Sequence, residues 1–393
     1  MVELSRREEF TQGRSRHAQV LWMKTGAMKD GRLVANELRV VADTGAYGGH
    51  AMTVQANTGA HPLPLYPAEN IRFHCEVAYT NLPAAGAMRG YGTPQGIFAV
   101  ELQMDEMAER LGMDPLEYRM KTCIKKGQDD PISRVLSEGK AIARRILDDG
   151  LEEAMRRGSE AFAWKGSGNG GRNSSGRGGK VRRGAGMACA LQGNGIPGID
   201  WGAVSIKIND DGSYNVLAGE ADLGGGGDTV VAQMVAETLG VELEQVVIYS
   251  GDTDRTPFDV GAYASSTTVV SGAAALKAAE DVRAQVLEAA AELLEARPDD
   301  LAIEGGEVRT SAGRGVSMRE VALHALYGQM RQIAATASYV APMSSPPVSA
   351  QFAEVEVDTE TGVVKVLRLV AAVDCGVCIH PLLAEGQVEG AVI

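Results

Sequence analysis

Three segments of this chain repeat a pattern that is typical of a long β-hairpin. In each, an alternating run leads to a turn containing Gly, and a second apolar run closes on Asp-x-Gly. The segments span residues 20–45, 203–224 and 353–376, and the first two turns contain Asp-Gly. Asp-Gly between alternating runs is a strong hairpin signal, because both residues tolerate the backbone angles of a tight turn. The sequence therefore predicts three hairpins, and their recurrence suggests related structural units.

Helical patterns separate these hairpins. Apolar residues recur at three- or four-residue spacing in 97–111, 231–239 and 282–293, which places them on one face of a helix. Gly112 suits the position just after the first helix, and Asp114-Pro115 suits the start of the next one. Hairpins mixed with helices, without regular βαβ alternation, predict an α+β fold of two lobes.

A stretch rich in Gly, Ser, Asn and Arg, residues 166–184, is interpreted as a flexible linker. We accordingly predict a first lobe at 1–160, a linker at 161–184 and a second lobe at 185–393. An Arg- and Gly-containing stretch can also bind RNA, but this one lacks interleaved aromatic residues. With a formal net charge of −13, the chain has no general attraction to nucleic acid.

Other sequence features predict a cytoplasmic protein without a membrane span. No run approaches the roughly 18 apolar residues that a span needs, and no N-terminal signal peptide is visible. The five cysteines are an odd, sparse set, which fits a reducing compartment better than a disulfide framework. Cys375 and Cys378, followed by His380, supply too few ligands for zinc and are interpreted as structural thiols in a buried strand.

Two glycine-rich segments, 88–95 and 222–229, carry the main functional signal, and each leads directly into a predicted helix. Glycine lets the backbone approach a ligand, and a helix N-terminus offers N–H groups to an anion. The pair therefore suggests a phosphate-bearing cofactor, although 224–227 could also be an ordinary turn. A Walker loop is excluded because no Lys follows the glycines, and a Rossmann loop fits poorly because the segment closes a hairpin.

The polar cluster at 263–268 leaves two interpretations open. Its hydroxyl groups precede a helix that we expect to begin near Gly272, where they could bind phosphate or cap the helix. Arg89 could be a surface arginine, and Tyr91 a half-buried aromatic in a turn. No catalytic triad, carboxylate pair or histidine motif is recognisable. The residues alone thus predict a two-lobed α+β protein that binds an anionic cofactor.

Ordered motifs extend this interpretation over nearly the whole chain. They are Thr80-Asn81-Leu82-Pro83, Ala87 to Gln95, Glu101 to Arg119, Asp222 to Gly240, Asp252 to Thr268, Phe352 to Gly362 and Asp374 to Gly390. Together they resemble the molybdopterin-binding large subunit of the xanthine dehydrogenase and aldehyde oxidoreductase family. The Ser265-Ser266 pair resembles the branch that includes bacterial xanthine and nicotinate dehydrogenases. The resemblance implies the α+β fold of that molybdopterin-binding domain.

The resemblance also implies roles for individual residues. Arg89 and Ala264 would lie near molybdenum and contact the cofactor without being side-chain ligands, and Tyr91 would flank the substrate ring. The remaining cofactor-binding residues would hold the pyrophosphate and nucleotide end: Gly224, Gly225, Gly226, Gly227, Thr229, Ser265, Ser266, Thr267 and Thr268. Backbone N–H groups and hydroxyls suit phosphates, and an aromatic face suits a planar heterocycle.

The sequence departs from the family pattern at several positions. Gly225 stands where Gln or Thr is common, and His380 stands where Asn usually precedes Pro381. The upstream glycine–phenylalanine loop and its glutamine are expected before Met1, and the general-base glutamate beyond Ile393. The resemblance therefore places no catalytic residue within this chain, and we expect the isolated chain to be inactive.

The family reaction is oxidative hydroxylation. By the resemblance, the cofactor is molybdopterin with molybdenum, in its cytosine dinucleotide form, and electrons pass to [2Fe–2S] and FAD on partner subunits. An N-heterocycle of the purine, xanthine or nicotinate type is the expected substrate. One alternative is an aldehyde or aryl-CoA oxidoreductase of the same family. Another is a catalytically inert cofactor-binding subunit or fragment, which needs a partner such as a second molybdopterin-binding chain.

Overall fold

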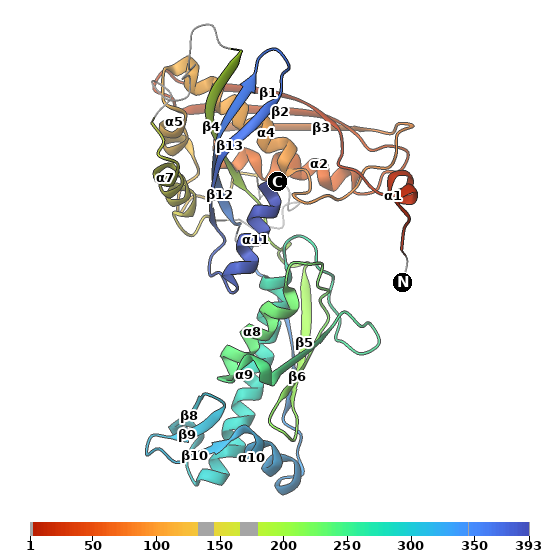
Figure 1. The fold of residues 1–393 in the computed structure, drawn as a ribbon, viewed down its shortest axis with the longest axis vertical. Helices are drawn as coiled ribbons and strands as arrows, with labels where there is room; N and C mark the ends of the chain where they lie inside the picture. The colour runs from red at the N-terminus through yellow and green to blue at the C-terminus, as the bar shows by residue number, and fades with distance from the viewer. Residues whose placement is uncertain (1–2, 133–144, 166–179, 345, 393) are drawn as a thin grey trace. The chain divides into compact units, whose positions relative to one another are not determined.

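The computed structural model describes residues 3–132, 145–165, 180–344 and 346–392 (Figure 1). The chain forms two compact units, and each combines two segments of the sequence. Unit 1 contains Met1–Gln192 and Ser345–Gly376, and unit 2 contains Gly193–Ser344 and Val377–Ile393. The predicted lobes are continuous stretches of sequence with boundaries at 160 and 185, whereas each unit is defined by its contacts and combines two separate segments. The lobe boundaries therefore stay a prediction.

The first predicted hairpin is confirmed in unit 1. Strands β1 (Gln19–Ala27) and β2 (Leu33–Asp43) pair antiparallel, with Gln19 opposite Ala42. Strand β3 (Asn70–Ala78) pairs parallel with β2, so the sheet has the order β1-β2-β3. A parallel pair needs a long connection, and here it contains α2 (Ala51–Ala60) and α3 (Pro62–Leu65).

The helix predicted at 97–111 is α4, Thr93–Leu111, and its C-terminal end is formed as the sequence indicated. Gly112 follows it with φ 69°, a left-handed conformation that glycine adopts without strain. Asp114 then caps α5 (Pro115–Thr122) by accepting hydrogen bonds from the backbone N–H groups of Leu116 and Glu117. Pro115 at the first helical position loses no hydrogen bond there.

A second sheet in unit 1 has the order β13-β12-β4 and contains the third predicted hairpin. Strands β12 (Val348–Asp358) and β13 (Val364–Asp374) pair antiparallel, and β4 (Val181–Leu191) pairs with β12. Helix α7 (Gly150–Phe162) packs on this sheet, with the rings of Phe162 and Phe352 stacked at 5.7 Å.

The predicted linker is partly wrong. Residues 166–179 lie outside the described part, but residues 181–184 begin β4 rather than a loop. Pairing with β12 decides this: Arg183 lies opposite Glu356, and its side chain forms an ion pair with that glutamate (3.1 Å). A cross-strand pair of opposite charges thus stabilises strand structure in a segment that looks like a solvated loop.

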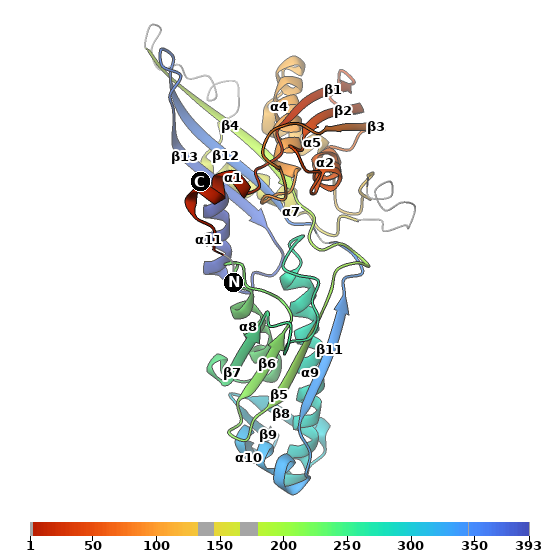
Figure 2. The same ribbon diagram turned by 90° about the vertical axis from the view of Figure 1, so that its right-hand side faces the viewer.

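Unit 2 contains the remaining predicted hairpin in a four-stranded sheet of order β11-β5-β6-β7. Strands β5 (Trp201–Ile208) and β6 (Tyr214–Ala218) pair antiparallel. Strand β7 (Val246–Ser250) is parallel to β6, and β11 (Ala334–Val340) is antiparallel to β5. Figure 2 shows the long helix α9 (Thr267–Leu294) running along this sheet beside α8 (Gly227–Leu239).

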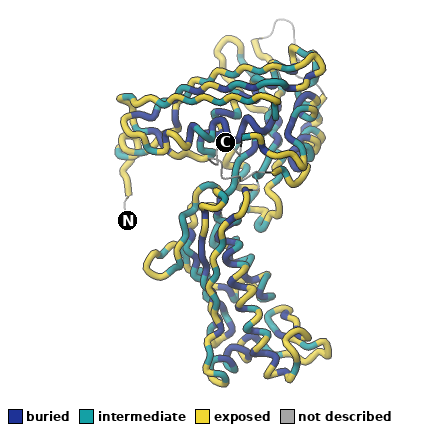
Figure 3. Tube along the Cα trace, turned by 180° about the vertical axis from the view of Figure 1, so that it is seen from behind, coloured by how far each residue is buried: buried dark blue, intermediate teal, exposed yellow. Residues whose placement is uncertain are grey.

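Small buried residues let α9 approach its neighbours closely. Ala274, Ala275, Ala278 and Ala279 are fully buried in the core of unit 2, against the apolar face of the sheet. Figure 3 shows the buried parts of the chain in dark blue. At Gly272, an added β-carbon would lie 2.8 Å from the Met234 sulfur of α8. The close packing of the two helices fixes the positions of both N-termini, where the candidate site lies.

The other elements are short. Within the described ranges, no helix is both long and apolar enough to cross a membrane. The bounds of these elements are α1 Arg6–Gln12, η1 Leu243–Gln245, η2 Pro298–Asp300, β8 Leu301–Glu304, β9 Glu307–Thr310, β10 Gly315–Ser317, α10 Met318–Leu323, η3 His324–Gly328 and α11 Pro381–Val392. Strands β8, β9 and β10 form a small sheet of their own.

Candidate cofactor site

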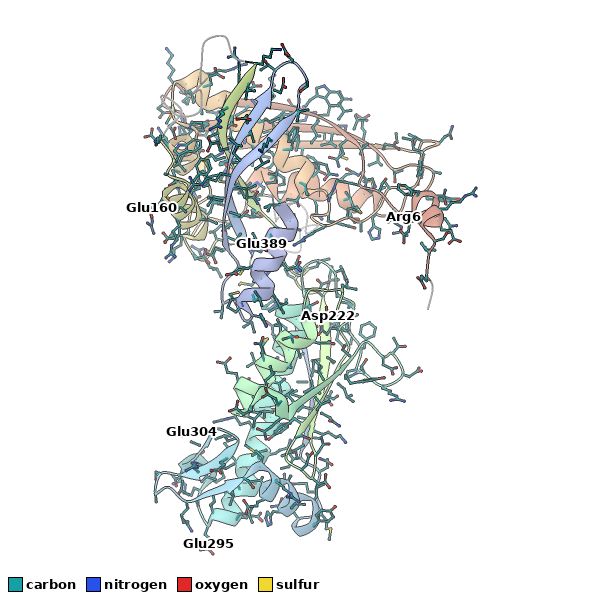
Figure 4. The ribbon with its side chains drawn as sticks, in the orientation of Figure 1. Arg6, Glu160, Asp222, Glu295, Glu304 and Glu389 are labelled. Atoms are coloured by element: carbon teal, nitrogen blue, oxygen red, sulfur yellow. The ribbon has the colours of Figure 1, made fainter. Side chains whose placement is uncertain are left out.

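The second glycine segment connects β6 to α8 and is held in shape by Asp222, which Figure 4 labels on the approach to the helix. The Asp222 carboxylate accepts hydrogen bonds from the backbone N–H groups of Gly224 (2.7 Å) and Gly226 (3.2 Å). Slight burial raises the pKa of Asp222, but these N–H groups outweigh it and hold the pKa below its usual value. The loop therefore has a defined conformation without a ligand.

The glycines of this loop have two different surroundings. A β-carbon on Gly226 would overlap the side chain of Leu383 on α11, and one on Gly227 would lie 2.5 Å from Glu220 Oε2. Around Gly224 and Gly225, by contrast, no atom of the described residues lies within 4 Å of an added β-carbon. Both residues are exposed. Packing inside the chain thus explains the glycines at 226 and 227, whereas 224 and 225 face open space.

Helix α8 also begins without a side-chain cap from its N-cap residue, Gly226. The first N–H groups of a helix have no partner within the helix, and the helix dipole favours negative charge there. The Asp222 carboxylate interacts with the backbone N–H groups of Gly224, Gly225, Gly226 and Asp228, so those of Gly227 and Thr229 remain for an anion at this helix terminus. Open space beside such a terminus suits a phosphate.

The segment 263–268 leads into α9 and is strained. Ala264 and Ser265 have φ values of 53° and 55°, in the left-handed region that side chains rarely adopt. The surrounding bonds hold this shape: Gly195 N donates to the carbonyl oxygen of Ala264 (2.7 Å), and the Tyr263 hydroxyl donates to Asp200 (2.9 Å). Backbone strain that the surroundings enforce in this way is common at functional sites.

Helix α9 begins at Thr267, not near Gly272, so the predicted start is wrong. Gly272 lies inside the helix, where its missing side chain admits Met234 of α8. Ser266 is the N-cap residue, but its hydroxyl makes no capping bond and donates instead to the carbonyl oxygen of Tyr263 (2.7 Å). Thr267 and Thr268 belong to the first turn of the helix.

The first glycine segment, which carries Arg89 and Tyr91, lies in unit 1. The Tyr91 hydroxyl lies 2.6 Å from His50 Nδ1 and 2.7 Å from the Thr53 hydroxyl, so the ring is fixed against the start of α2. Arg89 is exposed, and its carbonyl oxygen accepts a hydrogen bond from the Arg16 side chain (2.7 Å). A β-carbon on Gly92 would overlap the carbonyl oxygen of Val54.

The predicted residues therefore form two groups. Gly224, Gly225, Gly226, Gly227 and Thr229 lie in unit 2 together with the segment Ala264–Thr268. Arg89 and Tyr91 belong to unit 1. Within unit 2, the packing of α8 against α9 at Gly272 links the two groups of predicted phosphate-binding residues.

One functional candidate was missed: Glu220 is fully buried just before the glycine loop. Neither of its carboxyl oxygens has a hydrogen-bond partner among the described residues. Burial, followed by the charges of Asp228, Asp222 and Asp259, raises the pKa of Glu220 to about 7. The sequence signal was a charged residue immediately after an apolar strand, which is a weak signal because strand ends often carry charges.

Protein side chains form no metal site in the part of the chain that the structure describes. Across the described ranges, no three His, Cys, Asp or Glu side chains are grouped so that they could hold a metal ion. The thiols predicted to be buried are exposed, because β13 ends at Asp374 and Cys375 and Cys378 follow it. His380 accepts from the backbone N–H of Leu383 (3.3 Å) and so supports the start of α11.

Comparison with known proteins identifies the family of the chain. Residues 1–123 and 157–393 each match a family model described as a molybdopterin cofactor-binding domain. The chain is 39% identical over 397 residues to the probable hypoxanthine oxidase XdhD of Escherichia coli K12, covering 100% of this chain and 41% of that protein. It is 36% identical to the putative xanthine dehydrogenase molybdenum-binding subunit XdhA of the same organism, covering 99% and 51%.

Solved structures show the same fold. Quinoline 2-oxidoreductase from Pseudomonas putida 86 matches with a TM-score of 0.82 and 26% identity, over 98% of this chain and 51% of that one. Carbon monoxide dehydrogenase from Oligotropha carboxidovorans also has a TM-score of 0.82, at 23% identity over 98% and 50%. The predicted α+β fold class is confirmed. The chain spans about half the length of the curated relatives it matches.

Proposed function

The chain belongs to the molybdopterin-binding large subunits of the xanthine dehydrogenase and aldehyde oxidoreductase family, and on that premise we propose that it binds the molybdopterin dinucleotide of a molybdenum hydroxylase that oxidises an N-heterocycle. The open glycine loop at the start of α8 carries this proposal. Gly224 and Gly225 leave room for a ligand that the described residues do not fill.

The residues of unit 2 fit the phosphate end of such a cofactor. The backbone N–H groups of Gly227 and Thr229 would bind the pyrophosphate at the helix N-terminus, and Gly224, Gly225 and Gly226 would let it approach the backbone closely. Ser265, Thr267 and Thr268 would offer hydroxyls to the nucleotide. The Ser266 hydroxyl is bonded to Tyr263, so its contribution is to shape the loop. We propose the cytosine dinucleotide form.

When bound, the molybdenum centre supplies the redox chemistry of an oxidative hydroxylation. The chain's own part is to position the reactants. The left-handed backbone at Ala264 would bring its peptide group, without a long side chain, against the metal centre. Tyr91, fixed by His50 and Thr53, would present its ring to a planar substrate, and Arg89 would place a positive charge beside it.

The substrate class is proposed from the relatives. Their names refer to hypoxanthine and xanthine, and a nicotine 6-hydroxylase large subunit from Paenarthrobacter nicotinovorans is 28% identical. Quinoline is a further N-heterocycle among the structural matches. Aldehyde oxidoreductases also match, with TM-scores of 0.71 and 0.73. An aromatic aldehyde is therefore the competing substrate in the test.

We also propose the partners of the family: an iron–sulfur subunit, a FAD subunit and, for a divided enzyme, a second molybdopterin-binding chain. The cytoplasm is the proposed compartment. The inactivity expected of the isolated chain stays a prediction. An assay of cofactor-loaded, purified chain with xanthine, nicotinate and benzaldehyde tests it, and turnover at a rate typical of the family would contradict it.

Cofactor analysis tests the central proposal. Protein co-expressed with its genomic neighbours should release molybdenum and a cytidine nucleotide on acid extraction, in near-equal amounts. The loaded complex should then oxidise xanthine, hypoxanthine or nicotinate faster than benzaldehyde. Stoichiometric binding of another phosphate cofactor, without molybdenum, would contradict the proposal, and faster oxidation of benzaldehyde would contradict the substrate class alone.

A further inference from the structure

Glu220 lies next to the glycine loop and is fully buried, which is rare for a glutamate. Its side chain is fully buried between the end of β6 and the start of α8. A β-carbon on Gly227, the first residue of α8, would lie 2.5 Å from its Oε2 and 3.0 Å from its Oε1. Neither oxygen has a hydrogen-bond partner in the described part of the chain. The carboxyl group is therefore directed at the helix N-terminus without bonding to it.

The charged groups around Glu220 have the same sign. Asp222 lies on the same loop, Asp228 on α8 and Asp259 on the segment before α9. Asp259 is itself fixed by Gly261 N and by the Ser271 hydroxyl of α9, both at 2.8 Å. Among the described residues no Lys, Arg or His forms an ion pair with any of these four acids. A buried carboxylate in this environment is opposed by both desolvation and repulsion.

Two changes would offset the cost of a Glu220 carboxylate buried among three aspartates. A bound cation would neutralise the acids, but no group of acidic or other ligating side chains in the described residues has the arrangement of a metal site. The other way is a proton on Glu220. The neutral acid removes the repulsion with the three aspartates and with any anion that approaches the outer side of the loop.

We propose that binding of a phosphate anion at the glycine loop is coupled to uptake of a proton by Glu220. This inference rests on the proposed function, because it takes the pyrophosphate of the cofactor as the anion. The phosphate would approach the exposed side of the loop at Gly224 and Gly225, whereas Glu220 is buried beside Gly227 at the same helix terminus. Only one of them can carry its negative charge there at little cost.

Thermodynamic linkage gives the direction of the effect. The anion disfavours ionised Glu220, so it raises the pKa of this carboxyl above the value of about 7 that burial and the aspartates produce. Well below pH 7 Glu220 is already protonated, and cofactor affinity is independent of pH. Above pH 7 binding requires a proton, so affinity falls by up to tenfold per pH unit until the pKa of the bound state is reached.

The test compares wild type with Glu220→Gln, which is permanently neutral and of similar size. Cofactor-loaded proteins are dialysed to equilibrium between pH 6 and pH 9, and the retained pterin and molybdenum are measured. We expect wild type to lose cofactor increasingly above pH 7 and Glu220→Gln to retain it at every pH. The matched control is Glu304→Gln, which removes the same charge from an exposed position on β8 (Figure 4) and should behave as wild type.

A second measurement needs no variant. In wild type labelled with ¹³C at the glutamate side-chain carboxyl, one resonance should titrate near pH 7, and its midpoint should move upward in the loaded protein. A midpoint that does not move with loading, or equal pH slopes for wild type and Glu220→Gln, would overturn the inference and leave the proposed function intact. Wild type that holds no pterin at any pH would overturn both.

Discussion

The two glycine-rich segments look alike in sequence and differ in structure. In the segment before α4, the chain itself occupies the space that the glycines leave: β-carbons on Gly90 and Gly92 would overlap the ring of Pro94 and the carbonyl oxygen of Val54 on α2. In the segment before α8, β-carbons on Gly224 and Gly225 would meet no atom of the described residues within 4 Å, apart from the adjacent residues of the chain. Glycine content alone therefore does not identify a binding loop. The space beside the glycines separates a loop that the chain itself fills from one that it leaves open.

The polar groups of the two segments differ in the same way. Before α4, the Tyr91 hydroxyl is bonded to His50 and Thr53, so its hydrogen-bonding capacity is used within unit 1. Before α8, a fully buried carboxyl, Glu220, has no hydrogen-bond partner among the described residues. Unused hydrogen-bonding capacity is costly inside a folded protein, so it is retained where a ligand or a proton compensates for it.

The largest effect should come from filling the packed segment. Gly92→Ala places a β-carbon onto the backbone of α2 and forces a side chain into a φ of 92°. We expect a loss of about 3 kcal/mol or more in the free energy of unfolding, measured by urea denaturation. Gly225→Ala is the matched control and should be nearly neutral. A similar stability for the two variants would remove the contrast between the segments.

The second effect is a pH dependence of stability that only the open segment should produce. The pKa of Glu220 is about 7 in the folded protein and 4.5 as the reference value, so the folded state binds the proton more tightly. Its contribution to stability is complete below pH 4.5 and is lost as the pH rises through 7. Over this range Glu220→Gln should gain about 3 kcal/mol relative to wild type. Parallel stability curves for the two proteins, from denaturation at several pH values, would contradict this.

A smaller effect is expected at Tyr91. Tyr91→Phe removes the hydroxyl bonded to His50 and Thr53 but keeps the ring, and Tyr91 is only half-buried. We expect a loss of about 1 kcal/mol in the cofactor-free chain, the usual net worth of such hydrogen bonds. Tyr47→Phe, at an exposed position, should change nothing measurable. An unchanged free energy of unfolding in Tyr91→Phe would mean that the hydroxyl does not stabilise the chain and serves a ligand instead, as we propose for the segment before α8.

Local sequence signals predicted the elements and some of their limits, whereas tertiary packing decided the other limits. The three hairpins, the end of α4 at Gly112 and the cap at Asp114 follow from turn and capping chemistry that a few adjacent residues contain. The start of α9 was misplaced because Gly272 serves contact with α8, which no local pattern reveals. Residues 181–184 became strand through pairing with distant β12.

The candidate site shows the same limit. The glycine loop before α8 was recognisable because its composition is unusual. Glu220 was not, since its isolation depends on Asp228 and Asp259, which lie on other elements. The exposure of Cys375 and Cys378 likewise depends on where β13 ends. Burial and charge environment are three-dimensional properties, and a single sequence carries them only weakly.

The smallest effect on stability, and the sharpest test of the comparison, is Gly225→Val. Gly225 is exposed, its φ is outside the left-handed region, and the space around it is open among the described residues. A valine there should change the free energy of unfolding by less than about 0.5 kcal/mol. Because its branched side chain would occupy the space proposed for the pyrophosphate, we expect at least a tenfold lower content of molybdenum and pterin in protein purified with its partners.

The control for this variant is Gly224→Val at the neighbouring position, where φ is 94°. It fills the same open space but strains the backbone, so it should lower both stability and cofactor content. The two variants therefore distinguish a glycine that is needed for the backbone conformation of the loop from one that is needed for close approach of the cofactor. Full cofactor content in Gly225→Val would show that the open space is not used, and the two glycine segments would then both be turns.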